Sequence, residues 1–517
     1  MKKSAKPSKQ APLSKALHNF LYLTAALTGA AIMIVEILGA KMLSPFVGMS
    51  HFVWTAQIAV TMVALACGYY GGGWLVDHRP KISYLYLALL TASAYLVLTV
   101  MMCEPVANWC LDFNLALGTL LASTLLFFIP LALLAITGPF LVRIITSSVD
   151  GVGGTVGRLT SIGTLGSFAG TICIGYLMLP LLPNSHSMYL TAAVLALLCA
   201  VYFLVFGRKT GWTAASAGLL FLIFLATGRQ SVHETELFQE RYRGNSHFGE
   251  IRVLDRRDGR MRLFFNDNLI QNTYDPQTQK SLSAFTYALS GLARAYTASI
   301  RDVLCIGLGV GIVPLEFARE GANVDVVEIN PAVLPVASRF FDLKPEKMRI
   351  TIDDGRHFLN RCRQDYDVIV LDAFLGDSSP SHLMTREAFR AIAHRLRPQG
   401  TLVINVFCNV ESGRDYFAAS LEKTLKSVFD GVQLHYDDDQ HYFVATKRGN
   451  PRFIHNPETV LVHPALRSKV EKAFNQVIRI SSPNGRILTD DYNPVEYYDA
   501  KNRETLRRRF VQNLREM

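Results

Sequence analysis

Three glycines at alternate positions, Gly307, Gly309 and Gly311, stand between an apolar run and a segment with helical spacing. A turn of this kind after a strand is typical of a nucleotide-binding loop, because glycine lets a ligand approach the backbone with no side chain in the way. A tight structural turn would use the same residues. The glycines alone are therefore a weak signal for nucleotide chemistry.

Acidic residues follow three further apolar segments of the same region. Glu328 ends the segment NVDVVE, Asp354 and Gly355 follow MRITID, and Asp372 ends YDVIVLD. Ligands of parallel α/β sheets bind outside the carboxyl ends of the strands, so we expect these residues and the glycine turn at one edge of a sheet. An acid at the end of the second strand can accept hydrogen bonds from both hydroxyls of a ribose. The set predicts a nucleoside site, although each acid alone would also suit a solvated loop.

Two classes of nucleoside fit this spacing, a dinucleotide and an S-adenosyl compound. The dinucleotide fingerprint G-x-G-x-x-G has a glycine at its sixth position, and Pro314 occupies that position here. Acids after the third and fourth strands suit a positively charged sulfonium better than a dinucleotide. The pattern favours the S-adenosyl compound.

Strands that alternate with helices must position these residues. Segments with strand and helix character follow one another from Arg301 to Phe407, which predicts a doubly wound, mostly parallel sheet. A β-hairpin is expected before them, where Asp258 and Gly259 separate EIRVLD from MRLFF. An amphipathic helix, SLSAFTYALSGLARAY, follows the hairpin.

The first half of the chain has a different composition. Seven apolar segments are long enough to cross a bilayer, for which roughly 20 residues are needed, and they lie near residues 17–39, 52–76, 82–103, 115–142, 157–180, 187–206 and 211–227. The expected fold is therefore a multi-pass α-helical membrane domain followed by a Rossmann-like α/β domain. The predicted units are a basic tail (1–16), the membrane domain (17–228), a linker with hairpin and helix (229–290) and the catalytic α/β domain (291–517).

Two features inside the apolar segments stand out. Small residues that let helices pack closely are expected at Gly68, Gly71, Gly72, Gly73, Gly163, Gly166, Gly170 and Gly175. Glu36 is flanked by apolar residues on both sides, where an ionised carboxylate is costly. A role in binding or proton coupling and a protonated or Lys41-paired carboxylate are both open for Glu36.

Charge and cysteine usage limit the partners. The net charge of +10 is concentrated in the N-terminal MKKSAKPSKQ and in Arg507, Arg508 and Arg509, without interleaved aromatic residues. Basic ends of this kind are typical of topology signals and contacts with anionic lipid, so we expect a bilayer and no nucleic acid. With no C-x-x-C spacing and no clustered His/Cys set, no metal site is expected.

The residues also resemble a known family. The region 248–407 resembles the polyamine aminopropyltransferases, the spermidine synthase family, through a hairpin ending in Leu269-Ile-Gln271 and the blocks VLCIGLGVG, VVEIN, DDGRHFL and YDVIVLDAF. Most of the chain is similar to the membrane-fused branch of that family, through IVEILGAKMLSPFVG, GYYGGGWLVDHRP, DAFLGDSSPSHLMTREAF and LTDDYNP.

The resemblance implies a fold, a reaction and a set of roles. The fold would be that of the class I S-adenosylmethionine methyltransferases. The enzyme would transfer an aminopropyl group from decarboxylated S-adenosylmethionine to a small amine, with Asp372 as general base. Glu328 would bind the ribose, Asp354 and Gly355 would meet the adenine, and the remaining nucleoside contacts would come from Gln271, Gly307, Gly309 and Gly311. The amine would lie near Tyr287 and Asp377, with Asp490 and Asp491 in place of acids that the family has elsewhere.

The chain departs from the family at the amine site. Val310 and Leu375 stand where soluble members of the family have acids. A polycation needs several carboxylates, so two alternatives stay open: methyl transfer from intact S-adenosylmethionine on the same fold, and a transporter or receptor with a nucleoside-sensing domain. Further expected partners are the lipid bilayer and, as an open alternative, a second copy of the chain.

The location follows from two opposing arguments. Basic loops place the N-terminus in the cytoplasm, and seven spans would then place the α/β domain on the other side of the membrane. S-adenosyl nucleosides are made in the cytosol, and the cysteines Cys305, Cys362 and Cys408, which show no disulfide spacing pattern, suit a reducing compartment. We expect the inner cell membrane with the catalytic domain in the cytosol, which requires one of the seven segments to be re-entrant or miscounted.

Overall fold

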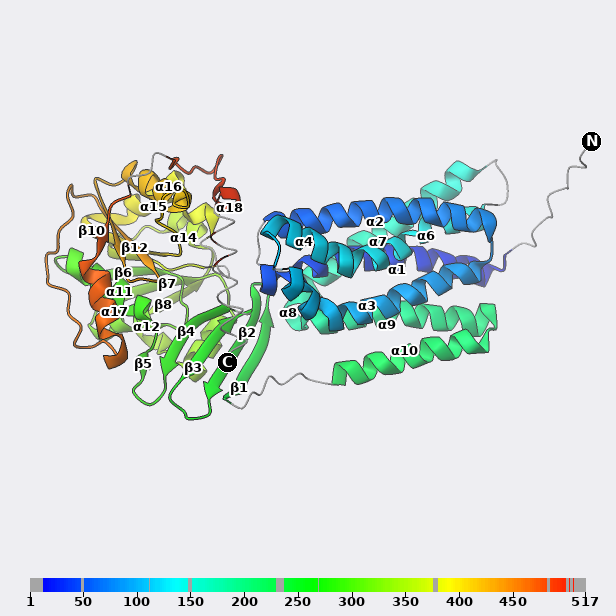
Figure 1. The fold of residues 1–517 in the computed structure, drawn as a ribbon, viewed down its shortest axis with the longest axis horizontal. Coiled ribbons are helices and arrows are strands. Elements are labelled where there is room, and N and C mark those ends of the chain that lie inside the picture. Colours follow the sequence, from blue (N-terminus) through cyan, green and yellow to red (C-terminus); the bar gives the residue numbers. More distant parts are fainter. Residues whose placement is uncertain are drawn as a thin grey trace, which may run out of the picture. The chain divides into compact units, whose positions relative to one another are not determined.

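The structure is a computed structural model that describes residues 13–47, 51–110, 112–146, 151–228, 237–267, 269–374, 380–480, 484–498, 502 and 505. The chain divides into two compact units, residues 1–44 with 51–231 and residues 45–50 with 232–517. The first unit is helical, and the second combines two sheets with helices (Figure 1).

The described part of the first unit contains seven helical runs long and apolar enough to cross a membrane. They are α1 (Lys15–Val47), α2 (His51–His78), α3 (Ile82–Cys110), the run Leu115–Ile145, the run Val152–Leu181, the run Asn184–Gly207 and α10 (Thr210–Gly228). Three of these runs are composite, and each contains one π-helical segment. The run Leu115–Ile145 consists of α4 (Leu115–Ser123), the π-helical segment Thr124–Phe128, α5 (Ile129–Ala135) and α6 (Thr137–Ile145). The run Val152–Leu181 consists of α7 (Val152–Cys173), the π-helical segment Ile174–Met178 and α8 (Leu179–Leu181), and the run Asn184–Gly207 consists of α9 (Asn184–Val201) and the π-helical segment Tyr202–Gly207. The seven predicted apolar helices are confirmed as helices.

Close glycine contacts hold several of these helices together. A Cβ on Gly166 of α7 would lie 2.0 Å from the carbonyl oxygen of Ala26 on α1, and one on Gly68 of α2 would lie 2.2 Å from that of Ala132. Backbones this close leave no room for a side chain, which confirms packing faces at both glycines. The same prediction is wrong for Gly71, Gly73 and Gly175, where no atom of the described residues lies within 4 Å of an added Cβ.

The second unit begins with an antiparallel sheet of five strands, β1 (Phe238–Ser246), β2 (Gly249–Arg256), β3 (Arg262–Asn266), β4 (Leu269–Asp275) and β5 (Lys280–Ser281), in that order. The predicted hairpin is the β2–β3 pair, in which Asp255 faces Arg262 next to the turn. The hairpin is thus part of a larger sheet. Helix α11 (Ala284–Tyr296) follows it.

The larger sheet has eight strands in the order β13-β11-β12-β10-β9-β6-β7-β8. Strands β6 (Asp302–Ile306), β7 (Asn323–Glu328), β8 (Arg349–Ile352), β9 (Tyr366–Leu371) and β10 (Leu396–Val406) are parallel, as predicted. Strands β11 (Gly431–Tyr436), β12 (His441–Thr446) and β13 (Val477–Ile478) were not predicted and pair antiparallel. The sheet is therefore mixed, because the four-residue turn between β11 and β12 can join only antiparallel neighbours.

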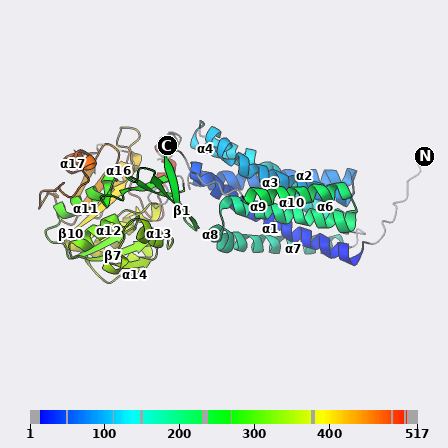
Figure 2. The same cartoon turned by 90° about the horizontal axis from the view of Figure 1, so that it is seen from below.

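Helices cover both faces of this sheet (Figure 2). One apolar cluster joins it to α11, α12 (Ile312–Arg319), α13 (Val333–Phe340) and α17 (Arg467–Asn475). A second cluster joins the opposite face to α14 (Gly355–Arg361), α15 (Arg386–Arg395), α16 (Tyr416–Lys426) and α18 (Val495–Tyr498). This Rossmann-like arrangement brings the carboxyl ends of β6, β7, β9 and β10 to one edge.

Candidate active site

The glycine turn after β6 requires glycine for two reasons, a positive φ and a close approach to the backbone after β9. Gly307 has a φ of +100°, and a Cβ there would lie 2.2 Å from the carbonyl oxygen of Asp372. Gly311 has a φ of +83° and stands immediately before α12. These positions favour glycine because other residues rarely adopt positive φ, and at Gly307 a side chain would also overlap the backbone after β9.

Glu328, at the end of β7, is built into the same turn. Its two carboxylate oxygens accept hydrogen bonds from the backbone N–H of Leu308 (2.9 Å) and of Asn330 (2.8 Å). Burial raises the pKa of Glu328, and the backbone donors oppose that shift. Each oxygen of a carboxylate can accept more than one hydrogen bond, so Glu328 keeps capacity for a ligand.

Asp354 caps the helix after β8. One of its oxygens accepts from the backbone N–H of Arg356 (2.8 Å) and His357 (3.0 Å), and the other lies 2.8 Å from Nε2 of His382. Burial alone would raise the pKa of Asp354, but the backbone donors and His382 lower it. The adjacent Gly355 is close-packed, since a Cβ there would lie 2.6 Å from a methyl group of Ile306.

Asp372 follows β9 and is held from two sides. Its backbone N–H donates to the carbonyl of Ile306 (2.9 Å), and its Oδ1 accepts from Nδ2 of Asn405 at the end of β10 (2.9 Å). Burial raises the pKa of Asp372 to about 6, against the opposing hydrogen bond from Asn405. A carboxylate with this pKa can both accept and release a proton near neutral pH.

Asn405 was not among the predicted site residues. Its own Oδ1 is buried and has no hydrogen-bond partner within the described ranges. The sequence did carry a signal, because Asn405 interrupts the apolar run TLVINVF at the carboxyl end of a strand, as Glu328 and Asp372 do.

A cavity of about 890 Å³ opens over these strand ends. Seven predicted residues line it, namely Gln271, Gly307, Gly309, Glu328, Asp354, Gly355 and Asp372. Asn405 and His382 line it as well. The structure thus brings six of the seven predicted nucleoside residues, together with Asp372, into one cavity.

Four predicted residues lie elsewhere. Gly311, Tyr287, Asp490 and Asp491 are not among the residues that line the cavity. Tyr287 is buried, and its hydroxyl donates to the carbonyl of Ser281 (3.1 Å). Asp377 and Leu375 lie outside the described residues.

Asp490 contributes to the packing of two helix ends. Its oxygens accept from the hydroxyl of Thr385 (2.6 Å), which precedes α15, and from Arg356 of α14 (3.2 Å). Its backbone N–H donates to Glu387 (3.0 Å). Asp491 is exposed. These contacts give Asp490 a structural role outside the cavity.

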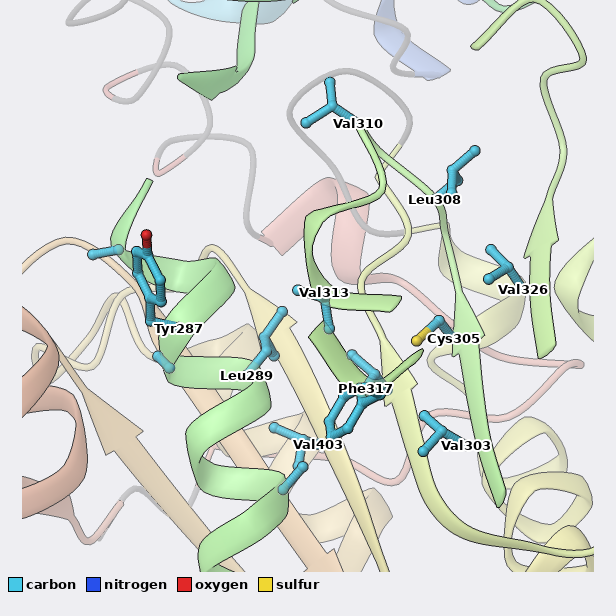
Figure 3. Close-up of a cluster of buried hydrophobic side chains, with 14 of the residues drawn as sticks. Tyr287, Leu289, Val303, Cys305, Leu308, Val310, Val313, Phe317, Val326 and Val403 are labelled. Carbon is cyan, nitrogen blue, oxygen red and sulfur yellow. The ribbon is translucent and has the colours of Figure 1, made fainter. Parts of the chain in front are cut away.

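Val310 faces the protein core. It is 1 % exposed and belongs to the cluster that includes Tyr287 and Val313. Figure 3 shows Val310 on the turn before α12, with Val313 and Phe317 following it on the helix. Within the described residues, no group of three or more His, Cys, Asp or Glu side chains is placed to hold a metal ion.

Comparison with known proteins identifies the region that carries the cavity. Residues 283–436 match the family described as Spermine/spermidine synthase domain. This stretch is a spermine/spermidine synthase domain. It contains Glu328, Asp354, Asp372 and Asn405, whereas Gln271 and the strand β12 lie outside it.

The relatives of this chain include aminopropyltransferases and methyltransferases. A polyamine aminopropyltransferase of Vibrio vulnificus is 36% identical over 140 residues, which cover 26% of this chain and 46% of that protein. A probable polyamine aminopropyl transferase of Bifidobacterium longum is 26% identical over 44% of this chain and 51% of that protein. An N-terminal histidine N-methyltransferase of Emericella nidulans is 34% identical over 28% of this chain and 26% of that protein.

The chain spans about half the length of the aminopropyltransferases that it matches. Among solved structures, spermidine synthase from Thermotoga maritima is similar at a TM-score of 0.37 with 17% identity, covering 54% of this chain and 99% of that one. The synthase domain and the aminopropyltransferase relatives indicate that the chain is a transferase.

Proposed function

We propose that the chain is a membrane-bound transferase that moves an aminopropyl group from decarboxylated S-adenosylmethionine to an amine acceptor. The observation that carries this proposal is Asp372, a half-buried residue whose carboxylate has a pKa raised by desolvation to about 6 and lines the cavity of the synthase domain. A carboxylate with a higher affinity for protons than usual, beside a glycine turn, is what removal of a proton from an attacking amine requires.

The cavity offers the donor a matching set of groups. Gly307 and Gly309 leave backbone exposed beside Glu328, whose carboxylate can accept from ribose hydroxyls. Gln271 and Asp354 line the same cavity. The unpartnered Oδ1 of Asn405 can accept a hydrogen bond from an amine that approaches Asp372. The donor, when bound, supplies a sulfonium whose attached carbon is open to nucleophilic attack.

The donor, the amine and Asp372 account for every bond and proton that changes in the reaction. The acceptor nitrogen forms a bond to the carbon next to the sulfonium, the carbon–sulfur bond breaks, and its electron pair stays on the sulfur of methylthioadenosine. The proton lost from nitrogen goes to Asp372. Alignment of nitrogen, carbon and sulfur in the cavity contributes most of the remaining acceleration.

The test is turnover by the purified full-length chain with decarboxylated S-adenosylmethionine and a panel of amines, followed by release of methylthioadenosine. Wild type is expected to turn over, and Asp372→Asn to lose the activity while its affinity for the nucleoside stays within a few fold. Turnover of Asp372→Asn at the wild-type rate would contradict the role of Asp372.

Methyl transfer from intact S-adenosylmethionine is the second candidate. Two observations favour it: methyltransferases are among the relatives, and Val310 leaves the glycine turn without an acid for the aminopropyl amine. Binding of both nucleosides by calorimetry decides between them. Preference for the decarboxylated form supports aminopropyl transfer, and preference for the intact form supports methyl transfer.

Seven apolar helices support insertion in the inner cell membrane. The cytosolic position of the catalytic unit is argued only from the donor, which is made in the cytosol, because seven spans after a cytoplasmic N-terminus would place this unit on the other side. A reporter that is active only outside the cytoplasm, fused to the C-terminus, tests the orientation. Its activity would place the catalytic unit on the outer side and remove the cytosolic part of the proposal.

A further inference from the structure

The cavity extends past Asp372 to the turn between β11 and β12. We call this part the hairpin lobe and define it by residues that line it: Glu411, Arg414, Tyr436, Asp438, Asp439, Gln440, His441 and Lys469. Gly307, Glu328 and Asp354 lie at the other strand ends, so a nucleoside held by them leaves the hairpin lobe for the acceptor.

His441, the first residue of β12, is the unusual member of the hairpin lobe. It is 5 % exposed, and neither ring nitrogen has a hydrogen-bond partner in the part of the chain that the structure describes. Its ring stacks on Tyr436 with the centroids 4.8 Å apart. Burial lowers the pKa of His441 to about 4, so the ring is neutral at physiological pH, with one N–H donor and one acceptor nitrogen.

Leaving buried polar atoms unpaired costs free energy, because each atom loses its hydrogen bonds to water without gaining new ones. The other buried histidine of this sheet, His435, has a hydrogen-bond partner for each ring nitrogen. Its Nδ1 lies 2.9 Å from the carbonyl of Ala473, and its Nε2 lies 2.9 Å from the hydroxyl of Tyr296. His441 therefore differs from its neighbour in having hydrogen-bonding capacity that a ligand in the cavity could use.

The charges of the hairpin lobe are already matched. Asp438 accepts from Lys472 (2.5 Å), and Asp439 is paired with Lys469. Glu411 lies 3.9 Å from Arg414. Each carboxylate of the lobe thus faces a cation, which leaves little uncompensated negative charge for a second ammonium group.

Asp372 and His441 lie at the same edge of the sheet. Asn405 on β10 contacts Asp372, and the next residue of β10, Val406, pairs with His441 of β12. Because β9 and β12 flank β10, the two residues are two strand spacings apart, roughly 10 Å. An amine whose nitrogen lies at Asp372 can reach His441 with a chain of about four carbons.

We infer that His441 determines acceptor specificity: its neutral ring binds an uncharged polar group of an amine whose only cationic centre is the reacting nitrogen. The acceptor class is an amino alcohol or a similar monoamine, in place of a polycation. This inference rests on the proposed function for the reaction at Asp372, but its binding component can be tested without turnover.

Three four-carbon amines make a matched panel: butylamine, 4-amino-1-butanol and putrescine. Their affinities are measured by calorimetry on the full-length chain in detergent with methylthioadenosine present, for wild type, His441→Leu, His441→Asn and the exposed control His455→Leu. Wild type is expected to prefer 4-amino-1-butanol. His441→Leu should weaken that amine about five- to tenfold, to the level of butylamine, which itself stays unchanged.

His441→Asn, which returns a polar side chain, should recover part of the affinity, and His455→Leu should match wild type. If His441 has only a structural role, its replacement should instead lower the melting temperature and weaken the binding of all three amines alike. Preference for putrescine, equal effects on the three amines, or no binding of any of them would overturn the inference. If binding depends on His441 but no turnover occurs, the hairpin lobe is still the amine-binding site and the proposed reaction is overturned.

Discussion

The carbonyl oxygen of Asp372 lies 2.2 Å from the position that a Cβ on Gly307 would occupy. The glycine turn after β6 and the acid after β9 are thus in direct contact, although the two residues are 65 positions apart in the sequence. Because the backbone of Asp372 fills the space beside Gly307, the glycine turn and the proposed general base are positioned by one another.

Gly307→Ala is expected to abolish turnover and nucleoside binding, since the new methyl group must displace the Asp372 backbone. Gly321→Ala is the matched control: Gly321 also has a positive φ, +88°, but nothing lies within 4 Å of an added Cβ. The control should lose about 1 kcal/mol of stability from backbone strain and keep its activity. Equal loss of activity in both variants, at equal melting temperatures, would contradict the contact with Asp372 as the cause.

Asn405→Leu is expected to shift the acidic limb of the pH–rate profile to higher pH. The hydrogen bond from Asn405 lowers the pKa of Asp372, so its removal should raise that pKa above about 6. The base must be ionised to accept a proton, and activity at pH 6 should therefore fall more than activity at pH 8. The measurement is kcat/KM against pH, and an unchanged limb would show that Asn405 does not tune the base.

Asp372→Asn should stabilise the fold at neutral pH while it removes activity. The folded-state pKa of Asp372, about 6, lies above the usual value near 3.8, so the folded state holds the proton more tightly than the unfolded state. Below pH 4 the protonated carboxyl group therefore favours the folded state. This contribution to stability is lost as the pH rises toward 6 and the group ionises. We expect the variant to gain about 1–3 kcal/mol at pH 7 and nothing at pH 4, measured by denaturant unfolding. A loss of stability at pH 7 would contradict desolvation of the carboxylate as the cause of its raised pKa.

Glu328→Gln is expected to weaken adenosyl-nucleoside binding at least tenfold, because an amide offers one acceptor oxygen where the carboxylate offers two. The Leu308 and Asn330 N–H groups both need an acceptor, so the melting temperature must be recorded beside the calorimetric affinity. A lower melting temperature with unchanged affinity would assign Glu328 to the architecture of the turn alone.

Gly166→Val should destabilise the helical unit, while Gly175→Val on the same run of helix should not. An added Cβ at Gly166 meets the backbone of Ala26, whereas Gly175 faces open space. The thermal stability of the full-length chain in detergent measures the difference. Equal behaviour of the two variants would contradict the α1–α7 contact.

The sequence by itself determined the seven apolar helices and the five parallel strands. Seven apolar runs and five strand segments followed from local periodicity, and the residues at the ends of those strands, Glu328, Asp354 and Asp372, could be predicted to share one edge. This was possible because the parallel connection of strands and helices fixes where carboxyl ends meet.

Tertiary structure decided which partner each side chain has. Asp490 pairs with Arg356 and Thr385 outside the cavity, Val310 turns into the core, and His441 is buried beside Tyr436. The antiparallel strands β11 and β12 bring His441 next to β10, and only their pairing places it in the cavity. Burial and pairing depend on contacts between residues far apart in the chain, and the pKa of Asp372 depends on both, so no local pattern could supply them.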